Sequence, residues 1–127
     1  MNILLDTHAA IWFFDGDERL SNSAANAIYN LDNMIYVSIA SLWEVAIKLS
    51  IDKLTIYGGL DGFVDAINKF EFALLKVEPE HVKETMNLPH IHRDPFDRML
   101  IAQANLDDMA IMTIDANIMK YEVKTIW

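Results

Sequence analysis

Short apolar runs alternate along the chain with longer segments in which apolar residues recur every three or four positions. The short runs predict buried strands at residues 2–5, 34–37, 73–77, 110–114 and 123–126. The periodic segments predict helices at residues 8–14, 21–31, 39–51, 60–70, 79–87, 95–106 and 116–120. Such alternation is typical of an α/β fold, so we expect a parallel sheet of four to five strands with helices on both faces.

Residues that favour helix ends stand at several of these boundaries. Asp94-Pro95 combines a capping side chain with the proline that suits a first helical turn. Ser21 or Asn22 is a suitable cap for the second helix, and Ser41-Leu-Trp-Glu44 matches the pattern of a capping box. These boundaries agree with the elements that the apolar pattern predicts.

Composition restricts the classes of protein to which the chain can belong. With 127 residues, 53% of them apolar, and no linker or repeat, residues 1–127 are expected to form a single domain. The absence of cysteine excludes disulfides, thiolate zinc sites and thiol nucleophiles. No apolar run approaches the roughly 18 residues of a membrane span, and the N-terminus lacks a signal-peptide pattern. We therefore expect a cytoplasmic protein without a membrane partner.

The net charge of −9 argues against a general nucleic-acid binder, because lysine and arginine contacts supply most of such affinity. It does not argue against a nuclease, whose acids can surround metal ions that reverse the local field. In that case a few basic residues would hold the phosphate backbone, and the candidates are Lys48, Lys53, Arg93 and Arg98.

Four carboxylates stand where predicted strands end or where the following helices begin: Asp6, Glu44, Asp97 and Asp115. Ligands of open α/β sheets bind outside the carboxyl ends of the strands, so a parallel sheet would gather these acids at one edge. Close carboxylates stay ionised only when a positive charge compensates them. Because Mg²⁺ and Mn²⁺ prefer oxygen ligands, the pattern predicts a metal-dependent enzyme that acts on phosphates.

Each of these acids also has a purely structural explanation. Asp6, Asp94 and Asp115 are suitable helix caps, but asparagine or serine would cap equally well, so the complete set favours metal binding. Whether Asp94 belongs to the metal site stays open. Glu44 and Lys48 are spaced for a salt bridge within one helix, which we favour over a contact between Lys48 and the phosphate of a substrate.

Hydroxyl and imidazole groups near the acids have two interpretations as well. Thr7 and Thr113 either orient waters around a metal ion or cap the local backbone. His8 is either a proton carrier or a packing residue of its helix. For His90 and His92 we favour an exposed loop over a metal site, because no third nitrogen or thiolate ligand lies at a usual zinc spacing.

Aromatic residues suggest a subunit interface. Trp12, Phe13 and Phe14 are adjacent and cannot all face inward from one helix, so at least one should need a partner to cover it. We therefore predict a homodimer through the early helices, with part of the helix around Trp43.

Four segments together resemble the PIN-domain family, and most closely the VapC-like toxins of type II toxin–antitoxin modules. They are Leu4-Leu-Asp-Thr-His8, the segment from Val37 to Lys48, the segment from Arg93 to Ala104, and Thr113-Ile-Asp115. The resemblance implies a small Rossmann-like sheet, an endoribonuclease that depends on Mg²⁺ or Mn²⁺, a homodimer and a cognate antitoxin. It places the family's acid quartet on Asp6, Glu44, Asp97 and Asp115. Some relatives mature or degrade RNA without being toxins.

Other classes of protein fit the sequence less well. A phosphoacceptor signalling domain needs paired acids after its first strand, where this chain has Asp6-Thr7-His8. Dinucleotide binding is disfavoured because no G-x-G-x-x-G motif follows a strand. A catalytically silent RNA or protein binder stays open, and metal-dependent cleavage of RNA would exclude it.

Overall fold

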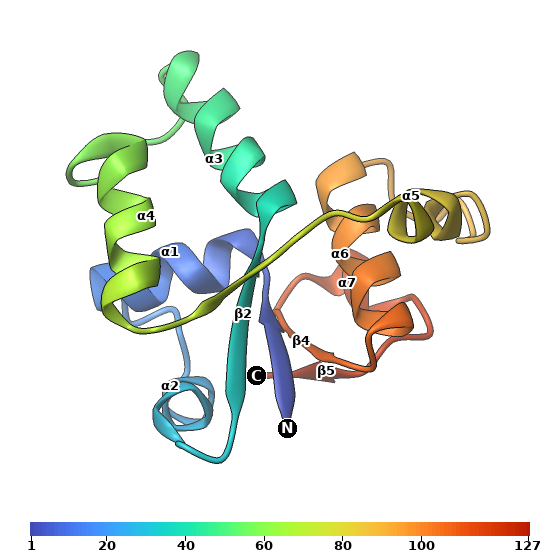
Figure 1. The fold of residues 1–127 in the computed structure, drawn as a ribbon, viewed down its shortest axis with the longest axis horizontal. Coiled ribbons are helices and arrows are strands. Elements are labelled where there is room, and N and C mark those ends of the chain that lie inside the picture. The colour runs from blue at the N-terminus through green and yellow to red at the C-terminus, as the bar shows by residue number, and fades with distance from the viewer.

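All five strands form one parallel sheet in the order β3-β2-β1-β4-β5 (Figure 1). The computed structural model describes residues 1–127. The strands are β1 (Asn2–Leu5), β2 (Met34–Ser38), β3 (Ala73–Leu75), β4 (Ala110–Met112) and β5 (Thr125–Ile126). The helices are α1 (Thr7–Asp15), α2 (Asn22–Tyr29), α3 (Ile39–Ser50), α4 (Gly59–Lys69), α5 (Pro79–Thr85), α6 (Pro95–Leu106) and α7 (Ala116–Met119). Every predicted element is present. No helix has the length and apolar character needed to cross a membrane.

Successive side chains of the strands point to opposite faces of the sheet, which gives the protein two cores. On one face, Ile3 and Leu5 pack with residues of α1, α2, α3 and α4. On the other face, Leu4 and Ile111 pack mainly with α6 and with Ile118 of α7. Figure 1 shows α1 to α4 on one side of the sheet and α5 to α7 on the other. The predicted arrangement, with helices on both faces, is confirmed.

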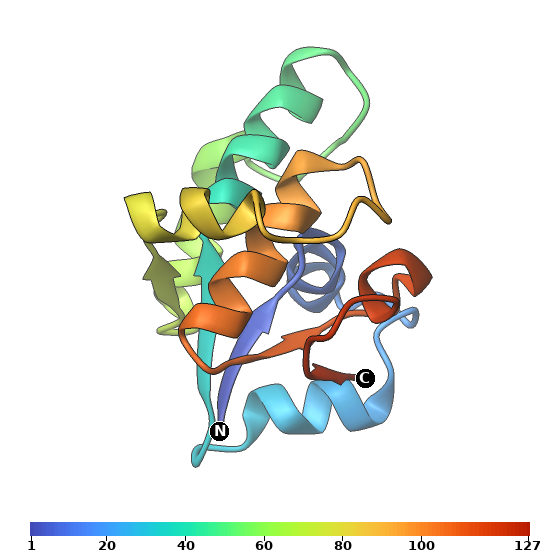
Figure 2. The same cartoon turned by 90° about the vertical axis from the view of Figure 1, so that its right-hand side faces the viewer.

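The carboxyl ends of the three central strands lie side by side. Leu5 of β1 is in register with Val37 of β2 and with Met112 of β4. The residues that come next, Asp6, Ser38 and Thr113, therefore lie side by side, with Ser38 as the last residue of β2. Figure 2 shows α6 running along one face of the sheet away from this same edge, so the first turn of α6 lies near the strand ends.

Several element ends differ from the predictions, but α3 begins directly after Ser38, as expected. The N-cap of α3 is Ser38, whose Oγ accepts a hydrogen bond from the Ala40 N–H at 3.0 Å. The predicted capping box from Ser41 to Glu44 is therefore wrong. Because β2 passes directly into α3 without a loop, Ser38 both ends the strand and caps the helix, and Glu44 lies in the second helical turn.

The adjacent aromatic residues of α1 pack partly within the chain itself. Phe13 and Phe14 contact Phe70, with ring centroids 4.9 Å and 5.9 Å apart. Trp12 meets the edge of Trp127 at 5.9 Å. Phe13 is buried, whereas Trp12 and Phe14 are half-buried, so the expectation that one of the three needs a partner stays a prediction.

A buried glutamine connects the two helices that carry predicted site residues. Gln103 of α6 is fully buried. Its Oε1 accepts a hydrogen bond from the Ser38 hydroxyl at 2.7 Å, and its Nε2 donates to the Lys76 carbonyl at 3.2 Å. Gln103 thus fixes α6 against the start of α3 and against the chain that leaves β3.

Replacing Gln103 by leucine should lower the free energy of unfolding by about 2 kcal/mol, because the Ser38 hydroxyl and the Lys76 carbonyl lose their partner. Urea unfolding followed by circular dichroism measures this change. The matched control is Asn105→Leu, at an exposed position of the same helix, where the change should stay within about 0.5 kcal/mol. Equal stability of the two variants would contradict the proposed connection.

Candidate functional site

The structure brings the four predicted carboxylates to one edge of the sheet. Asp6 follows β1, Asp115 follows β4, Glu44 lies in α3, and Asp97 is the third residue of α6. Repulsion from Glu44 and Asp115 acts on Asp97, and repulsion from Asp115 acts on Asp6. The four acids therefore form one electrostatically connected group, which we call the acid cluster.

Three aspartates at this edge cap helices, but each cap occupies only one carboxylate oxygen. The Oδ1 atoms of Asp6 and Asp115 each accept a backbone N–H at 2.7 Å, and Oδ1 of Asp94 accepts one at 2.8 Å and a second at 3.2 Å. The backbone makes no such bond to their Oδ2 atoms. The capping and metal-binding interpretations are therefore compatible in this structure.

Burial opposes the ionised form of the acid cluster. It is the largest cause of the raised pKa of Asp6, although hydrogen bonds from Thr113 and the Ala9 N–H act in the opposite direction. Burial also raises the pKa of Asp97 to about 7, opposed by His92 and reinforced by the negative charges of Asp94, Glu44 and Asp115. A divalent cation would relieve this repulsion, and the available oxygen donors suit such a cation.

Glu44 is almost fully buried, with 4% of its surface exposed, and both of its carboxylate oxygens have partners. Oε1 accepts the Thr7 hydroxyl at 2.6 Å, and Oε2 accepts Lys48 Nζ at 2.9 Å. The Thr7 hydroxyl also lies 3.0 Å from the Ser41 hydroxyl. The salt-bridge interpretation of Lys48 is confirmed, and Lys48 compensates one negative charge of the acid cluster.

Thr113 links two members of the acid cluster. It is fully buried at the end of β4, and its Oγ1 accepts the Asp115 N–H at 3.0 Å. Its side chain also hydrogen-bonds the carboxylate of Asp6. The hydroxyls of Thr7 and Thr113 thus both contact carboxylates of the cluster, which holds these acids in fixed orientations.

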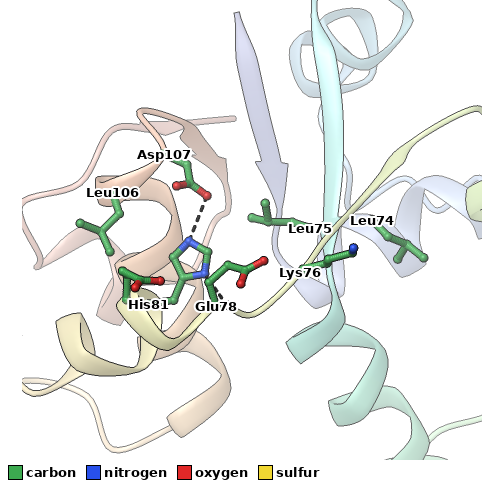
Figure 3. Close-up of a pocket in the computed structure, with 8 residues that line it drawn as sticks. Leu74, Leu75, Lys76, Glu78, His81, Leu106 and Asp107 are labelled. Carbon is green, nitrogen blue, oxygen red and sulfur yellow. Dashed lines mark hydrogen bonds and ion pairs between the residues drawn. The ribbon is translucent and has the colours of Figure 1, made fainter.

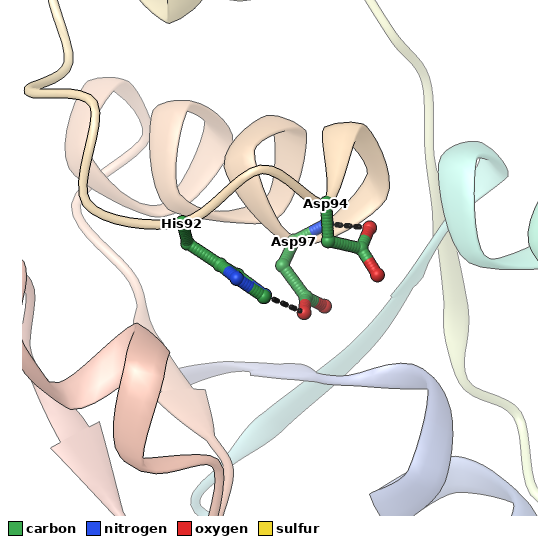
Figure 4. Close-up of side chains that lie close together, drawn as sticks. All are labelled: His92, Asp94 and Asp97. Atoms are coloured by element: carbon green, nitrogen blue, oxygen red, sulfur yellow. Dashed lines mark hydrogen bonds and ion pairs between the residues drawn. The ribbon is translucent and has the colours of Figure 1, made fainter.

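His92 also belongs to this site, contrary to the exposed-loop interpretation. Its Nε2 lies 2.8 Å from Oδ2 of Asp97, and potential ligand atoms of His92, Asp94 and Asp97 lie within 4.8 Å of one another (Figure 4). His90 is exposed, as expected. The sequence offered one signal: His92 stands two residues before the Asp94 cap, so the turn into α6 can return it to the first helical turn.

Arg98, which the sequence placed among the candidate phosphate contacts, makes its contacts within the chain. Its guanidinium donates to the Tyr121 hydroxyl at 3.0 Å and to carbonyl oxygens at the end of α5 and in the segment between α5 and α6. These neighbouring groups use its N–H donors, so its role in phosphate binding stays a prediction.

A hollow of about 600 Å³ lies away from the acid cluster, between β3, the start of α5 and the end of α6 (Figure 3). None of the four acids lines it. The imidazole of His81 lines this hollow. Its Nδ1 accepts the Glu78 N–H at 3.0 Å, and its Nε2 lies 3.0 Å from Oδ2 of Asp107. These contacts stabilise the start of α5 and occupy both ring nitrogens of His81.

Solved structures with similar folds include two complexes and one isolated toxin. VapBC2 from Rickettsia felis, bound to a DNA fragment from its promoter, matches with a TM-score of 0.73 and 13% identity over 99% of this chain and 98% of that one. DNA-bound VapBC from Salmonella typhimurium matches with a TM-score of 0.68 and 13% identity over 99% and 97%. VapC20 of Mycobacterium tuberculosis, a toxin that cleaves the sarcin-ricin loop, matches with a TM-score of 0.63 and 16% identity over 93% of each chain.

A search of curated protein sequences gives no match. The family model of the PIN domain, in contrast, matches residues 3–124, which include all four acids and nearly the whole sheet. Together with the parallel sheet and the acid cluster at its edge, this match shows that the chain belongs to the PIN-domain family.

Proposed function

We propose that this protein is an endoribonuclease that depends on Mg²⁺ or Mn²⁺, and that it is the toxin of a type II toxin–antitoxin module. The observation that carries the proposal is the acid cluster at the carboxyl edge of a PIN-domain sheet, in which Asp6 and Glu44 are buried. Two of its members have pKa values that burial raises, so the cluster needs a cation to stay ionised. We further propose that residues 1–127 act as a single domain.

Asp6 and Asp97 would hold the metal ion, together with Glu44 or Asp115. When bound, such an ion supplies Lewis-acid chemistry, which activates water and stabilises negative charge on a phosphodiester. Asp6 and Asp115 each keep one oxygen that no backbone N–H occupies. These oxygens match the preference of hard divalent ions for carboxylate ligands.

The protein's own groups hold the acids in place for this chemistry. Thr7 and Lys48 fix the two oxygens of Glu44, and Thr113 holds Asp6 close to Asp115. The N-termini of α1 and α6 add partial positive charge beside Asp6 and Asp97. These contacts limit the freedom of the acids before an ion binds.

An RNA substrate would meet few positive charges around this site. Lys48 is half-buried beside Glu44, and Arg93 is exposed one residue before the Asp94 cap. These two residues are the best candidates for phosphate contacts, since the donors of Arg98 are occupied within the chain. With a net charge of −9, recognition would depend mainly on the metal ion and on the shape of the RNA.

The partner of such a toxin would be a cognate antitoxin. Two of the similar structures are VapBC complexes, and this likeness in fold supports a partner protein for the chain. An arginine or lysine of the antitoxin would compensate the acid cluster in place of the metal ion. The cytoplasmic location predicted from the sequence belongs to the same proposal.

The alternative within the family is a PIN-domain nuclease that processes RNA without being a toxin. The acid cluster would be the same in both cases, so the site does not separate them. A short neighbouring gene for a DNA-binding antitoxin would favour the toxin.

We propose that the homodimer forms mainly through α3, whose apolar residues are more exposed than those of α1. Ile39, Trp43 and Ile47 follow one another at four-residue spacing, with 37%, 64% and 37% of their surfaces exposed. They form an apolar stripe on one face of the helix. Trp43 and Ile39 also line an apolar cleft of about 340 Å³, together with Phe96 and Met99. A second copy of the chain would cover this surface.

Replacing Asp97 by asparagine should reduce RNA cleavage by more than about 100-fold, beyond the loss expected for a merely supporting group. The metal-free variant should nevertheless be more stable at pH 8 than the wild-type protein, by roughly 1 kcal/mol or about 4 °C in Tm, because a poorly solvated charge and its repulsion from neighbouring acids are removed. RNA cleavage assays and thermal melts in EDTA measure the two effects.

The gain in stability should depend on pH. The folded-state pKa of Asp97, about 7, lies above its ordinary value of 3.8, so its contribution to stability is full below about pH 4 and is lost as pH rises through 7. The difference between variant and wild type should therefore grow from pH 5 to pH 8. Asp65→Asn, at an exposed position of α4, is the control and should show no such trend. A fully active Asp97→Asn protein would refute the metal assignment.

Binding of Mn²⁺ or Mg²⁺ to the native state should raise the melting midpoint as the metal concentration increases. At a metal concentration of a hundred times Kd, the free energy of unfolding should rise by about 2.7 kcal/mol. EDTA should stop cleavage and Mn²⁺ should restore it, whereas Ca²⁺ should bind but support little cleavage because its geometry is looser. The Asp6→Asn variant should lose most of the stabilisation. Cleavage that continues in EDTA, with a melting midpoint that no metal moves, would mean that the acids are only caps and surface charge.

The apolar stripe of α3 should hold two copies together at micromolar concentration. Replacing Ile47 by glutamate would place a charge in that stripe and should give a monomer by light scattering, without loss of secondary structure. The control is Leu31→Glu, since Leu31 is 99% exposed in the turn before β2 and should leave the dimer intact. A wild-type protein that is already a monomer would contradict the proposal.

A further inference from the structure

The contact between His92 and Asp97 fixes one oxygen of a proposed metal ligand. Nε2 of His92 lies 2.8 Å from Oδ2 of Asp97, and only 18% and 15% of the two side chains are exposed. An ionised carboxylate has no donor, so the Nε2–H of His92 donates to it. Oδ1 of Asp97 has no protein donor and is available to another partner (Figure 4).

A buried tyrosine holds the loop that carries His92. The segment between α5 and α6 has no regular hydrogen-bond pattern of its own near His92. The Tyr121 hydroxyl accepts the N–H of His92 at 2.9 Å and the N–H of Ile91 at 3.3 Å. Only 5% of Tyr121 is exposed, so this anchor is part of the core beneath the loop.

Arg98 holds the same loop from the side of α6. It donates to the Tyr121 hydroxyl at 3.0 Å. It also donates to three carbonyl oxygens, those of Thr85 at 2.8 Å, Pro89 at 2.9 Å and Leu88 at 3.4 Å. Arg98 has no carboxylate partner, although it follows Asp97 directly in the chain. Its charge thus orders the carbonyls of the loop and does not compensate the acid cluster.

From these contacts we infer that His92 is a positioning residue for the metal site, held in place by Tyr121 and Arg98. Its imidazole fixes Oδ2 of Asp97 and would leave Oδ1 for a metal ion. The inference rests on the proposed metal-dependent function. It adds His92, Tyr121 and Arg98 to the residues on which the metal site depends. Groups that orient a metal ligand in this way change metal affinity or activity by about 10–100-fold.

A hydrogen bond explains His92 better than direct coordination. Mg²⁺ and Mn²⁺ favour oxygen ligands over imidazole. Coordination through Nε2 would also break the bond to Asp97 at 2.8 Å and free the carboxylate that this bond orients. The Nε2–H therefore serves the site through Asp97.

The test compares the Mn²⁺ affinity of the full chain with that of His92→Ala, His92→Gln and His90→Ala by isothermal titration calorimetry. His92→Ala should bind Mn²⁺ about 10–100-fold more weakly, while its circular dichroism spectrum stays unchanged. His92→Gln should recover much of the affinity, because its amide N–H can donate from nearly the same place. His90→Ala, exposed in the same loop, should match the wild type.

Two further measurements separate positioning from general damage to the fold. His92→Ala should need more Mn²⁺ for RNA cleavage but keep its KM for RNA at saturating Mn²⁺. Tyr121→Phe removes only the hydroxyl that anchors the loop, and should also weaken Mn²⁺ binding. Wild-type affinity in Tyr121→Phe would overturn the role of the anchor.

The remaining outcomes are decisive for His92 itself. Equal Mn²⁺ affinity in His92→Ala and His90→Ala would overturn the inference and leave the proposed nuclease intact. A nitrogen coupling in the pulsed electron paramagnetic resonance of bound Mn²⁺ that disappears in His92→Gln would show direct coordination, and would also overturn it. A wild-type chain that neither binds Mn²⁺ nor cleaves RNA would refute the proposed function and this inference together.

Discussion

Negative charge buried at one edge of the sheet is the constraint on which the local structure around the site depends. Asp6 and Glu44 are only 6% and 4% exposed, yet each carboxylate must be compensated. The structure compensates them in part, through helix N-termini, threonine hydroxyls and the ammonium of Lys48. Asp6 and Asp97 still have raised pKa values, because burial, and after it the negative charge of neighbouring acids, opposes their ionised forms more than the chain's own groups favour them.

The parallel sheet is what concentrates this charge. Neighbouring strands in register end at the same level, so the residues that follow Leu5 and Met112 leave the sheet together. Gln103 then fixes α6 against the start of α3, which sets Asp97 near Glu44 although the two residues are far apart in the chain. The geometry of the site therefore follows from strand register and from one buried polar contact between helices.

Two basic residues near the site, Lys48 and Arg98, have different roles. Lys48 reaches Glu44 and compensates charge inside the acid cluster. Arg98, next to Asp97 in sequence, turns to the carbonyl oxygens of the preceding loop and to Tyr121. Arginine suits this second role because its planar group carries five N–H donors that can reach several oxygens at once. The site thus keeps its negative charge, while the loop beside it is held firmly.

The sequence by itself determined the elements, the parallel α/β class and the four acids, because apolar periodicity and strand-end position are local properties. It also identified the Glu44–Lys48 pair, since residues four apart in a helix are neighbours. Only the tertiary structure decided the position of His92, the direction of Arg98 and the packing of Trp12 against Trp127. Each of these depends on how a loop, a helix and the C-terminus meet in space. No local pattern encodes such contacts, because their partners come from separate elements that only packing brings together.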